Sequence, residues 1–411
     1  MSEIVAHGSL RKGWRLARFT GFLKGIERKI MVDDSAYYDC VGVRWYGLGA
    51  FVRERLLGGN ITRRQQWVIR TGDVVYNKLF AWKGAFAIAD DSVDGCIVSD
   101  KFPLYSLDPT VMDPKYLALY FRTSQLAQQA QILSKGAAAI SKLTLNPPQF
   151  WDLIIPLPPL NEQRRIAARV SEQMALVEEM RQAARAQVEA AKALPAAFLR
   201  QVFESMQSGQ YPKVRLGDVC DFLPAKSLRT GGNTKVLAVT TACLSEVGFL
   251  PTGLKEAYMD GVDANWARLY PVEVLIARSN TPELVGRVAH YTGHPKGIVA
   301  SDLTIRLWPK DSGIRGAFLA AYLAALYVVG YWREKAGGTS GTMKKITRTH
   351  LAALTVPVPG ITEQQRIIVQ LQERIAHVKE VRQAVEAQLE AISAFPGVLL
   401  EEVFGGFEPP A

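Results

Sequence analysis

One long stretch occurs twice in this chain of 411 residues, and the repeat constrains the fold more than any other feature. The first copy runs from Pro156 to Phe203 and begins Pro-Leu-Pro-Pro-Leu-Asn-Glu-Gln-Arg-Arg-Ile. The second runs from Pro357 to Phe404 and begins Pro-Val-Pro-Gly-Ile-Thr-Glu-Gln-Gln-Arg-Ile. The copies align without a gap and agree at almost half of their positions. Such self-similarity predicts a chain built twice on one plan.

Each copy is predicted to form a long helix. Asn161 and Thr362 follow the prolines and can act as N-caps, and Thr362 with Gln365 has capping-box form. Pro195 and Pro396 are expected to end or kink the helices after about 33 residues, which is about 50 Å of helix. A short second helix is expected after each proline.

Apolar residues recur in steps of four and three along one narrow seam of each helix, as a coiled-coil partner requires. Gln187 and Gln388 are predicted to lie on equivalent seam positions, where a polar residue fixes register. The alternative is that each stripe packs only on its own domain. The seam residues are Ile166, Val170, Val177, Met180, Ala184, Ala191 and Leu194 in the first copy and Ile367, Leu371, Val378, Val381, Val385, Ile392 and Phe395 in the second.

The segment before each copy reads as a mixed α/β domain. Short runs rich in Val, Ile and aromatic residues alternate with Gly and Asp turn signals. A helix is expected from about Pro114 to Leu133 and another from about Gly316. The sequence thus predicts an α/β (α+β) tandem repeat, with two globular domains separated by two long antiparallel coiled-coil helices in a pseudo-two-fold arrangement. The expected boundaries are 1–155, 156–206, 207–355 and 356–411.

The repeat extends more weakly into these domains. Lys78 lines up with Arg278, and Ser99-Asp100 lines up with Ser301-Asp302. The run Ser141-Lys-Leu-Thr144 resembles Lys344-Lys-Ile-Thr347.

Composition favours a reducing compartment and a polyanionic partner. The four cysteines show no paired spacing, so neither a disulfide framework nor a zinc knuckle is indicated, and we expect a cytoplasmic protein. No secretory signal and no membrane span is expected, because the longest apolar stretch, Ala317 to Trp332, is too short. The net charge is +10, and its excess lies in the two non-helical segments, which suits nucleic acid. Mild basicity can also serve solubility alone.

Several side chains are candidates for DNA contact. The glycine-rich run from Ala336 to Lys345 offers backbone donors, hydroxyls and two ammonium groups to phosphate, and Ser134 to Lys142 is its expected partner. Lys78 and Arg278 follow strand-like runs, where side chains can project from a sheet. The candidates are Arg63, Arg64, Lys78, Lys83, Lys142, Arg278, Arg287, Thr339, Ser340, Lys344 and Lys345.

Catalytic motifs are not found. Asn146-Pro-Pro-Gln-Phe is near the Asn-Pro-Pro-aromatic loop of adenine methyltransferases, but its aromatic residue is displaced and no glycine-rich cofactor loop follows a strand. His290 and His294 lie in a turn-like run, which disfavours a shared metal. We therefore predict no catalytic residue, no metal and no cofactor in this chain. A stand-alone methyltransferase with degenerate motifs and a protein scaffold without DNA binding remain the alternatives.

The paired runs at 156–166 and 357–367 resemble the conserved regions of type I restriction-modification specificity subunits, and the resemblance covers nearly the whole chain. It implies two target-recognition domains that each read one half of a split double-stranded DNA target. The helices would act as spacer and docking surface for modification subunits, expected to be two, and for restriction subunits. Those partners would carry the S-adenosylmethionine and the ATP and Mg²⁺. The residues expected to serve docking or helix pairing are Glu162, Gln163, Arg165, Ile166, Val177, Glu363, Gln364, Arg366, Ile367 and Val378.

Overall fold

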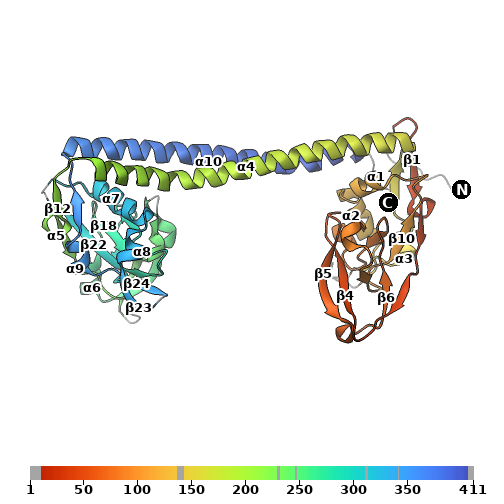
Figure 1. Cartoon of the computed structure of the whole chain (residues 1–411), viewed down its shortest axis with the longest axis horizontal. Helices are drawn as coiled ribbons and strands as arrows, with labels where there is room; N and C mark the ends of the chain where they lie inside the picture. The colour runs from red at the N-terminus through yellow and green to blue at the C-terminus, as the bar shows by residue number, and fades with distance from the viewer. Residues whose placement is uncertain are drawn as a thin grey trace. The chain divides into compact units, whose positions relative to one another are not determined.

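The computed structural model describes residues 11–136, 143–228, 232–245, 248–310, 313–340 and 342–405, and the side chains of residues 339 and 340 lie outside this description. The chain divides into two compact units, one made of Met1–Ala183 with Leu389–Ala411 and the other of Ala184–Gln388. Each unit contains one α/β domain and a segment of each long helix (Figure 1).

The first unit contains two sheets and a two-stranded ribbon. The sheet orders are β2-β10-β7-β8 and β3-β6-β9-β4-β5, and β1 pairs with β11 so that Arg18 lies opposite Ile154 and the two ends of the domain meet. Strand β7 is a continuous apolar run and is fully buried, as a central strand should be. The strands are β1 (Arg15–Arg18), β2 (Leu23–Gly25), β3 (Lys29–Met31), β4 (Tyr37–Val43), β5 (Ala50–Leu57), β6 (Gln65–Val68), β7 (Val74–Tyr76), β8 (Phe86–Ile88), β9 (Ile97–Val98), β10 (Leu104–Leu107) and β11 (Ile154–Leu157).

The second unit repeats this framework and adds to it. Its sheet β13-β22-β18-β20 has the same order as β2-β10-β7-β8, and the ribbon β12-β25 matches β1-β11. The other sheets are β17-β14-β21, β19-β24-β23 and β15-β16. The strands are β12 (Lys213–Arg215), β13 (Cys220–Leu223), β14 (Thr234–Val239), β15 (Leu244–Ser245), β16 (Gly248–Phe249), β17 (Lys255–Met259), β18 (Val274–Ala277), β19 (Ser279–Asn280), β20 (Val288–His290), β21 (Val299–Ala300), β22 (Thr304–Pro309), β23 (Gly337–Ser340), β24 (Met343–Lys345) and β25 (Thr355–Pro357). The predicted α/β tandem repeat is confirmed.

Short helices cover these sheets. In the first unit they are α1 (Pro114–Tyr120), α2 (Ser124–Leu133) and α3 (Pro147–Phe150), and in the second α5 (Leu216–Val219), α6 (Gly261–Ala267), α7 (Gly316–Val328), α8 (Tyr331–Lys335) and α9 (Arg348–Ala352). The apolar α7 is buried on most sides, as expected, with Leu319 and Leu323 fully enclosed. No helix among the described residues is both long and apolar enough to cross a membrane.

The helix expected from Pro114 to Leu133 is wrong in one respect, because it is two helices. Thr123 interrupts it: its hydroxyl donates to Tyr120 O at 2.7 Å and accepts from Leu126 N at 3.4 Å, which caps α2. A threonine that caps a new helix competes with continuation of the old one. Asp113 caps α1.

The long helices α4 (Leu160–Ser208) and α10 (Ile361–Phe404) correct three expectations. They begin one residue before Asn161 and Thr362, so these residues lie in the first turn instead of capping it. Pro195 and Pro396 lie inside the helices and do not end them. The short second helix expected after each proline is instead a continuation of the long one. The residues that follow are buried, including Leu199 at 2% and Phe404 at 1% exposure, and this packing offsets the hydrogen bond that proline removes.

The two helices run antiparallel beside each other within each unit (Figure 1). In the first unit Arg169 pairs with Glu402 at 3.3 Å, and in the second Arg374 donates to Gln201 at 2.7 Å. The predicted seam is right at nine of its 14 residues, and Val385 is half-buried. Ile166, Val170, Val177, Ala184, Ala191, Ile367, Leu371, Val378 and Ile392 are buried, whereas Met180, Leu194, Val381 and Phe395 are 39–50% exposed.

The predicted register residues are also wrong. Gln187 and Gln388 are exposed, and Val188 is buried next to the first of them. The apolar stripe drifts around an α-helix of this length, so a residue that a strict repeat assigns to the seam turns outward.

Candidate nucleic-acid interface and helix anchors

Lys78 and Arg278 occupy the same place in the two domains. Lys78 follows β7, and its N–H donates to Lys101 O while its carbonyl accepts from Leu145 N, both at 3.0 Å. Arg278 follows β18 and repeats both bonds at 2.8 Å, the second of them with Ile346 N. Two backbone bonds fix each residue at the end of a central strand. The repeat therefore places one cation at the same sheet edge in each domain, as the sequence suggested.

The same bonds correct the alignment of the repeat. The sequence pattern matches Thr144 with Thr347. In the structure, however, Leu145 and Ile346 make the equivalent hydrogen bonds, and Asn146 and Thr347 precede α3 and α9 in the same way. The ungapped alignment of the long helices continues through this region.

Arg63 and Arg64 have different surroundings. Arg63 is exposed and forms an ion pair with Asp100. Arg64 is half-buried, donates to Gly58 O at 2.8 Å and to Val32 O, and pairs with Asp34 at 2.7 Å. Its guanidinium thus holds the β3 end of the five-stranded sheet. Arg63 keeps its side chain at the surface.

Lys83 and Arg287 lie against aromatic rings. The Lys83 ammonium is 3.7 Å from the centre of the Trp45 ring and 5.0 Å from that of Trp82. Arg287 donates to the Tyr327 hydroxyl at 3.2 Å. Both cations are half-buried. These contacts orient the charges by cation–π and hydrogen-bond interactions instead of leaving them free.

The glycine-rich run was expected to be a loop, but it forms a β-hairpin. Strands β23 and β24 pair antiparallel, and β19 adds to β24 with Ser279 opposite Lys345 and Asn280 opposite Lys344. Because Arg278 directly precedes β19, the hairpin brings Lys344, Lys345 and Arg278 together on one small sheet. Lys345 is exposed and Lys344 is half-buried.

Three other candidates cannot be placed. Lys142 lies outside the described residues, as do the side chains of Thr339 and Ser340. Their contact with DNA stays a prediction.

A basic and aromatic surface that the sequence analysis missed lies on the β4–β5 connection. Trp45 and Tyr46 are 41% and 62% exposed, and Tyr46 has a φ of 59°. The Tyr46 N–H donates to Lys83 O at 2.9 Å, which holds the connection against the 3₁₀ helix at Ala81–Lys83. Arg44 is also exposed at this surface. A non-glycine residue at positive φ is a signal that only a structure gives.

Gln163 and Gln364 anchor the long helices to their own domains. Gln163 is fully buried, accepts from Asp113 N at 2.8 Å and donates to Val111 O at 3.0 Å and Pro158 O at 2.9 Å. Gln364 is fully buried too and forms the matching three bonds with Arg315 N at 2.9 Å, Gly313 O at 2.7 Å and Pro359 O at 2.8 Å. The prediction of helix pairing or subunit docking did not include this internal role.

The remaining helix candidates fall into two groups. Ile166, Val177, Ile367 and Val378 are buried between or beneath the helices. Glu162 pairs with Arg165 at 3.7 Å and Glu363 with Arg366 at 2.6 Å on the surface. The hydrogen bonds from Arg366 lower the pKa of Glu363.

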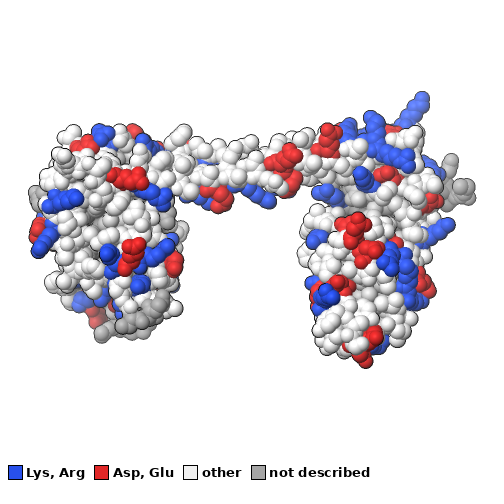
Figure 2. All heavy atoms as spheres, viewed as in Figure 1, with Lys and Arg blue, Asp and Glu red and all other residues white. Residues whose placement is uncertain are grey.

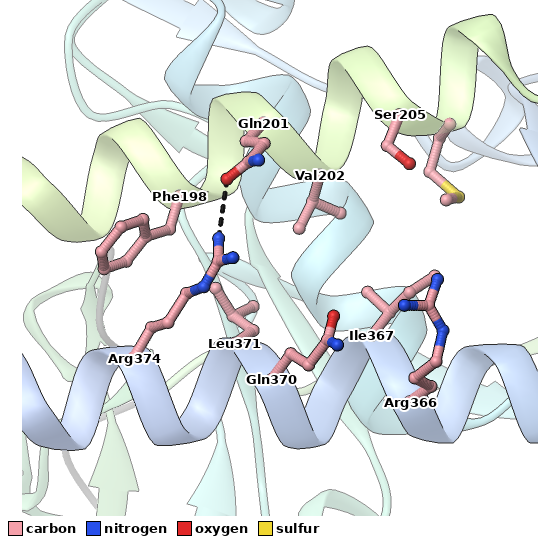
Figure 3. Close-up of a pocket in the computed structure, with 10 residues that line it drawn as sticks. Phe198, Gln201, Val202, Ser205, Arg366, Ile367, Gln370, Leu371 and Arg374 are labelled. Carbon is pink, nitrogen blue, oxygen red and sulfur yellow. Dashed lines mark hydrogen bonds between the residues drawn. The ribbon is translucent and has the colours of Figure 1, made fainter.

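A cavity of about 210 Å³ lies between α4 and α10 in the second unit. Figure 3 shows Arg374 reaching across to Gln201, with Phe198 beside it and Arg366 at the other end. The lining mixes apolar residues with cationic and amide groups. Such a lining suits a protein partner better than a catalytic centre.

The described residues hold no group of three or more His, Cys, Asp or Glu that could bind a metal. His290 ends β20, and burial lowers its pKa. Burial also raises the pKa of the Cys220 thiol to about 12, which leaves it protonated and unreactive. Basic and acidic side chains are interspersed over the face shown in Figure 2.

The fold and its surfaces define a duplicated, two-domain protein with paired helical segments. Residues 12–190 match the family model described as the type I restriction modification DNA specificity domain. The chain is 22% identical over 314 residues to the type I restriction enzyme StySPI specificity subunit of Salmonella potsdam, and the match covers 72% of this chain and 65% of that protein.

Two solved structures share the fold. One is the HsdS subunit from Thermoanaerobacter tengcongensis, with a TM-score of 0.61, 22% identity and 99% of both chains covered. The other comes from a study of complex assembly and conformational transition of the type I R-M system, with a TM-score of 0.66, 22% identity and 96% and 98% covered. Residues 12–190 therefore resemble the type I restriction modification DNA specificity domain, and the chain shares its fold with these two structures.

Proposed function

We propose that this chain is the DNA sequence-specificity subunit of a type I restriction-modification complex and has no catalytic activity of its own. Each α/β domain reads one half of a bipartite target. The matching places of Lys78 and Arg278 carry the proposal, because two equivalent sites in one chain suit a target with two halves. The match of residues 12–190 to the specificity-domain model supports it independently.

The two domains present different side chains to the two halves of the target. In the second domain, Arg278, Lys344 and Lys345 lie on one three-stranded sheet, where Arg can pair with guanine and Lys with phosphate. In the first domain, Lys78 and Arg63 lie near Asp100, and Lys83 lies between two tryptophans. Basic groups interleaved with aromatic rings are typical of nucleic-acid surfaces.

The helical segments dock the modification subunits, of which we propose two, and these bring S-adenosylmethionine. Restriction subunits with ATP and Mg²⁺ join the same complex. The cavity between α4 and α10, with Arg366 and Arg374 in its wall, supports a protein contact at this place. The boundaries 1–155, 156–206, 207–355 and 356–411 are proposed as the functional divisions of the chain.

The test is co-expression of the full chain with the modification subunit encoded beside it, followed by genome-wide mapping of methylated adenine. Two short specified halves around a fixed unspecified gap are the expected result. Methylation of a continuous site, or no methylation from a well-formed complex, would overturn the proposal. Binding of duplex DNA should also weaken steeply as salt rises, because each phosphate contact releases counterions.

A further inference from the structure

A cavity of about 490 Å³ opens beside Lys78 in the first domain. This volume falls within the range of about 300–1,000 Å³ that is usual for small-molecule sites. Four of its twelve lining residues are aromatic, with Trp67, Phe102 and Trp151 among them, and Asp100 and Glu27 add carboxylates. The cavity thus combines flat apolar surfaces with a few charged groups.

Two of the predicted DNA contacts meet at this cavity. Lys78 lines it directly, and Arg63 is paired with Asp100 in its wall. Glu27 is likewise paired, with Lys29 at 2.8 Å. Both lining carboxylates are thus paired with a cation, so the charge of Lys78 favours an anionic ligand.

A buried tyrosine also lines the cavity. Tyr105 lines it and is 3% exposed, and no hydrogen bond of acceptable geometry satisfies its hydroxyl within the described residues. The Tyr76 hydroxyl lies nearby but donates to Leu145 O at 3.0 Å. Buried polar groups are nearly always satisfied, so an unpaired one beside a cavity points to a ligand with polar edges.

We propose that this cavity binds a nucleobase, an inference that rests on the proposed DNA-binding function for its DNA source. The aromatic rings stack on the base, Tyr105 and the carboxylates bond to its edge, and Lys78 binds the attached phosphate. Stacking on aromatic side chains contributes about 1–3 kcal/mol per base in single-strand binding proteins. The base comes either from an unpaired position in DNA bound to this domain or from a free nucleotide.

The second domain lacks this lining. The strand registers match Tyr105, opposite Val74, with Leu307, opposite Val274. When this alignment of the two domains is extended along the chain, every aromatic residue of the cavity wall corresponds to a smaller or aliphatic residue in the second domain. Trp67, Phe102, Tyr105 and Trp151 correspond to Ala267, Thr304, Leu307 and Ala352. The site belongs to one half of the repeat and cannot be a framework feature.

Gly25 offers a way to close the cavity. It lines the cavity and lies directly opposite Tyr105 in the β2–β10 pair, so a side chain there projects on the same face as Tyr105. A Cβ added at Gly25 meets no atom within 4 Å. The Cβ of Gly25→Leu therefore meets no clash, and we expect the rest of the leucine side chain to enter the cavity. Gly21→Leu is the matched control, because its Cβ also meets no atom within 4 Å and Gly21 does not line the cavity.

The experiment measures binding of the four nucleoside monophosphates to the full chain by calorimetry, and binding of a duplex with one unpaired base against the same duplex fully paired. We expect saturable nucleotide binding with a Kd of about 1 mM or tighter, or a preference of at least about tenfold for the unpaired base, or both. Gly25→Leu should abolish the effect and Gly21→Leu should keep it. Lys78→Ala should weaken the binding of nucleotides but not the binding of nucleosides.

The outcomes separate the two proposals. Binding of paired DNA without any response to free nucleotide or unpaired base refutes the nucleobase site and leaves the DNA-binding function intact. Nucleotide binding that Gly25→Leu removes, in a chain that binds no DNA, supports the site with a free nucleotide as its ligand and refutes the function. Binding unchanged by Gly25→Leu places the ligand elsewhere and overturns the inference.

Discussion

Replacing Arg306 by Leu should destabilise the second domain by about 3–5 kcal/mol. Arg306 is 1% exposed and all five of its N–H groups donate hydrogen bonds. Two go to the carboxylate of Glu273 at 2.8 Å, and the others go to the carbonyls of Pro224, Trp266 and Arg268 at 2.6–2.9 Å. The substitution leaves a buried carboxylate whose other partner is a backbone N–H, together with three carbonyls that lose a donor.

The first domain supplies a matched comparison. Asp73 occupies the place of Glu273, and each accepts from a backbone N–H three residues upstream, at 2.7 and 2.8 Å. The arginine partner of Asp73 is Arg28, and the Arg28 side chain is 36% exposed. The ion pair of the second domain is enclosed instead, and the side chain of Glu273 is 0% exposed. Water can reach the site vacated by Arg28, so Arg28→Leu should cost less, about 1–2 kcal/mol.

Urea unfolding followed by hydrogen exchange in β18 and β22 measures the loss within the second unit. The double variant Arg306→Leu with Glu273→Leu should recover most of the stability, because removing both charges avoids an unpaired buried carboxylate. A cost below about 1 kcal/mol for Arg306→Leu, or a double variant as unstable as the single one, would refute this reasoning.

Three further outcomes follow from the described contacts. Gln364→Leu should lower the stability of the second unit by about 2–3 kcal/mol, because it leaves two carbonyls and an N–H without their partner. The control Gln365→Leu lies on the exposed face and should leave the urea midpoint unchanged. The double variant Lys344→Ala with Lys345→Ala should weaken DNA binding across all sequences. Titrations over a range of salt should show the slope of log K against log salt concentration reduced by up to about 1.8. An altered sequence preference would instead identify a base reader. Burial lowers the pKa of His290, so as pH falls the imidazole is protonated in the unfolded chain before it is protonated in the folded chain. The stability that the neutral, buried His290 gives the fold is therefore complete above about pH 6.5 and is lost as pH falls below it. Urea midpoints of the wild type and His290→Gln between about pH 7.5 and 5 should converge at the acid end.

The periodic parts of the fold were predictable from the sequence. The duplicated stretch and its apolar steps predicted two long helices that pair, and both exist. Their ends and register were not predictable, because they depend on tertiary packing. Pro195 and Pro396 carry a local signal to stop, but buried neighbours such as Leu199 and Phe404 hold the helix together beyond them.

The candidate site was predicted in position more than in detail. Lys78 and Arg278 follow β7 and β18 as predicted, because a cation after a buried strand is a local pattern, and their contact with DNA stays a prediction. Arg64 was chosen on charge alone, and the structure uses it to hold carbonyls inside its domain. The surface at Trp45 and Tyr46 was missed because exposure and a positive φ leave no trace in a single sequence.

Comparison of the two halves separates what the fold requires from what recognition requires. Gln163 and Gln364 make the same three kinds of bond, and Asp73 and Glu273 accept from equivalent backbone groups. Yet the arginine that meets each acid comes from a different part of the domain, and the aromatic cavity beside Tyr105 has no counterpart in residue type. Framework contacts are thus repeated while the surfaces between them differ. A protein that read two identical half-sites would gain nothing from this asymmetry, whereas one that reads two different half-sites needs it.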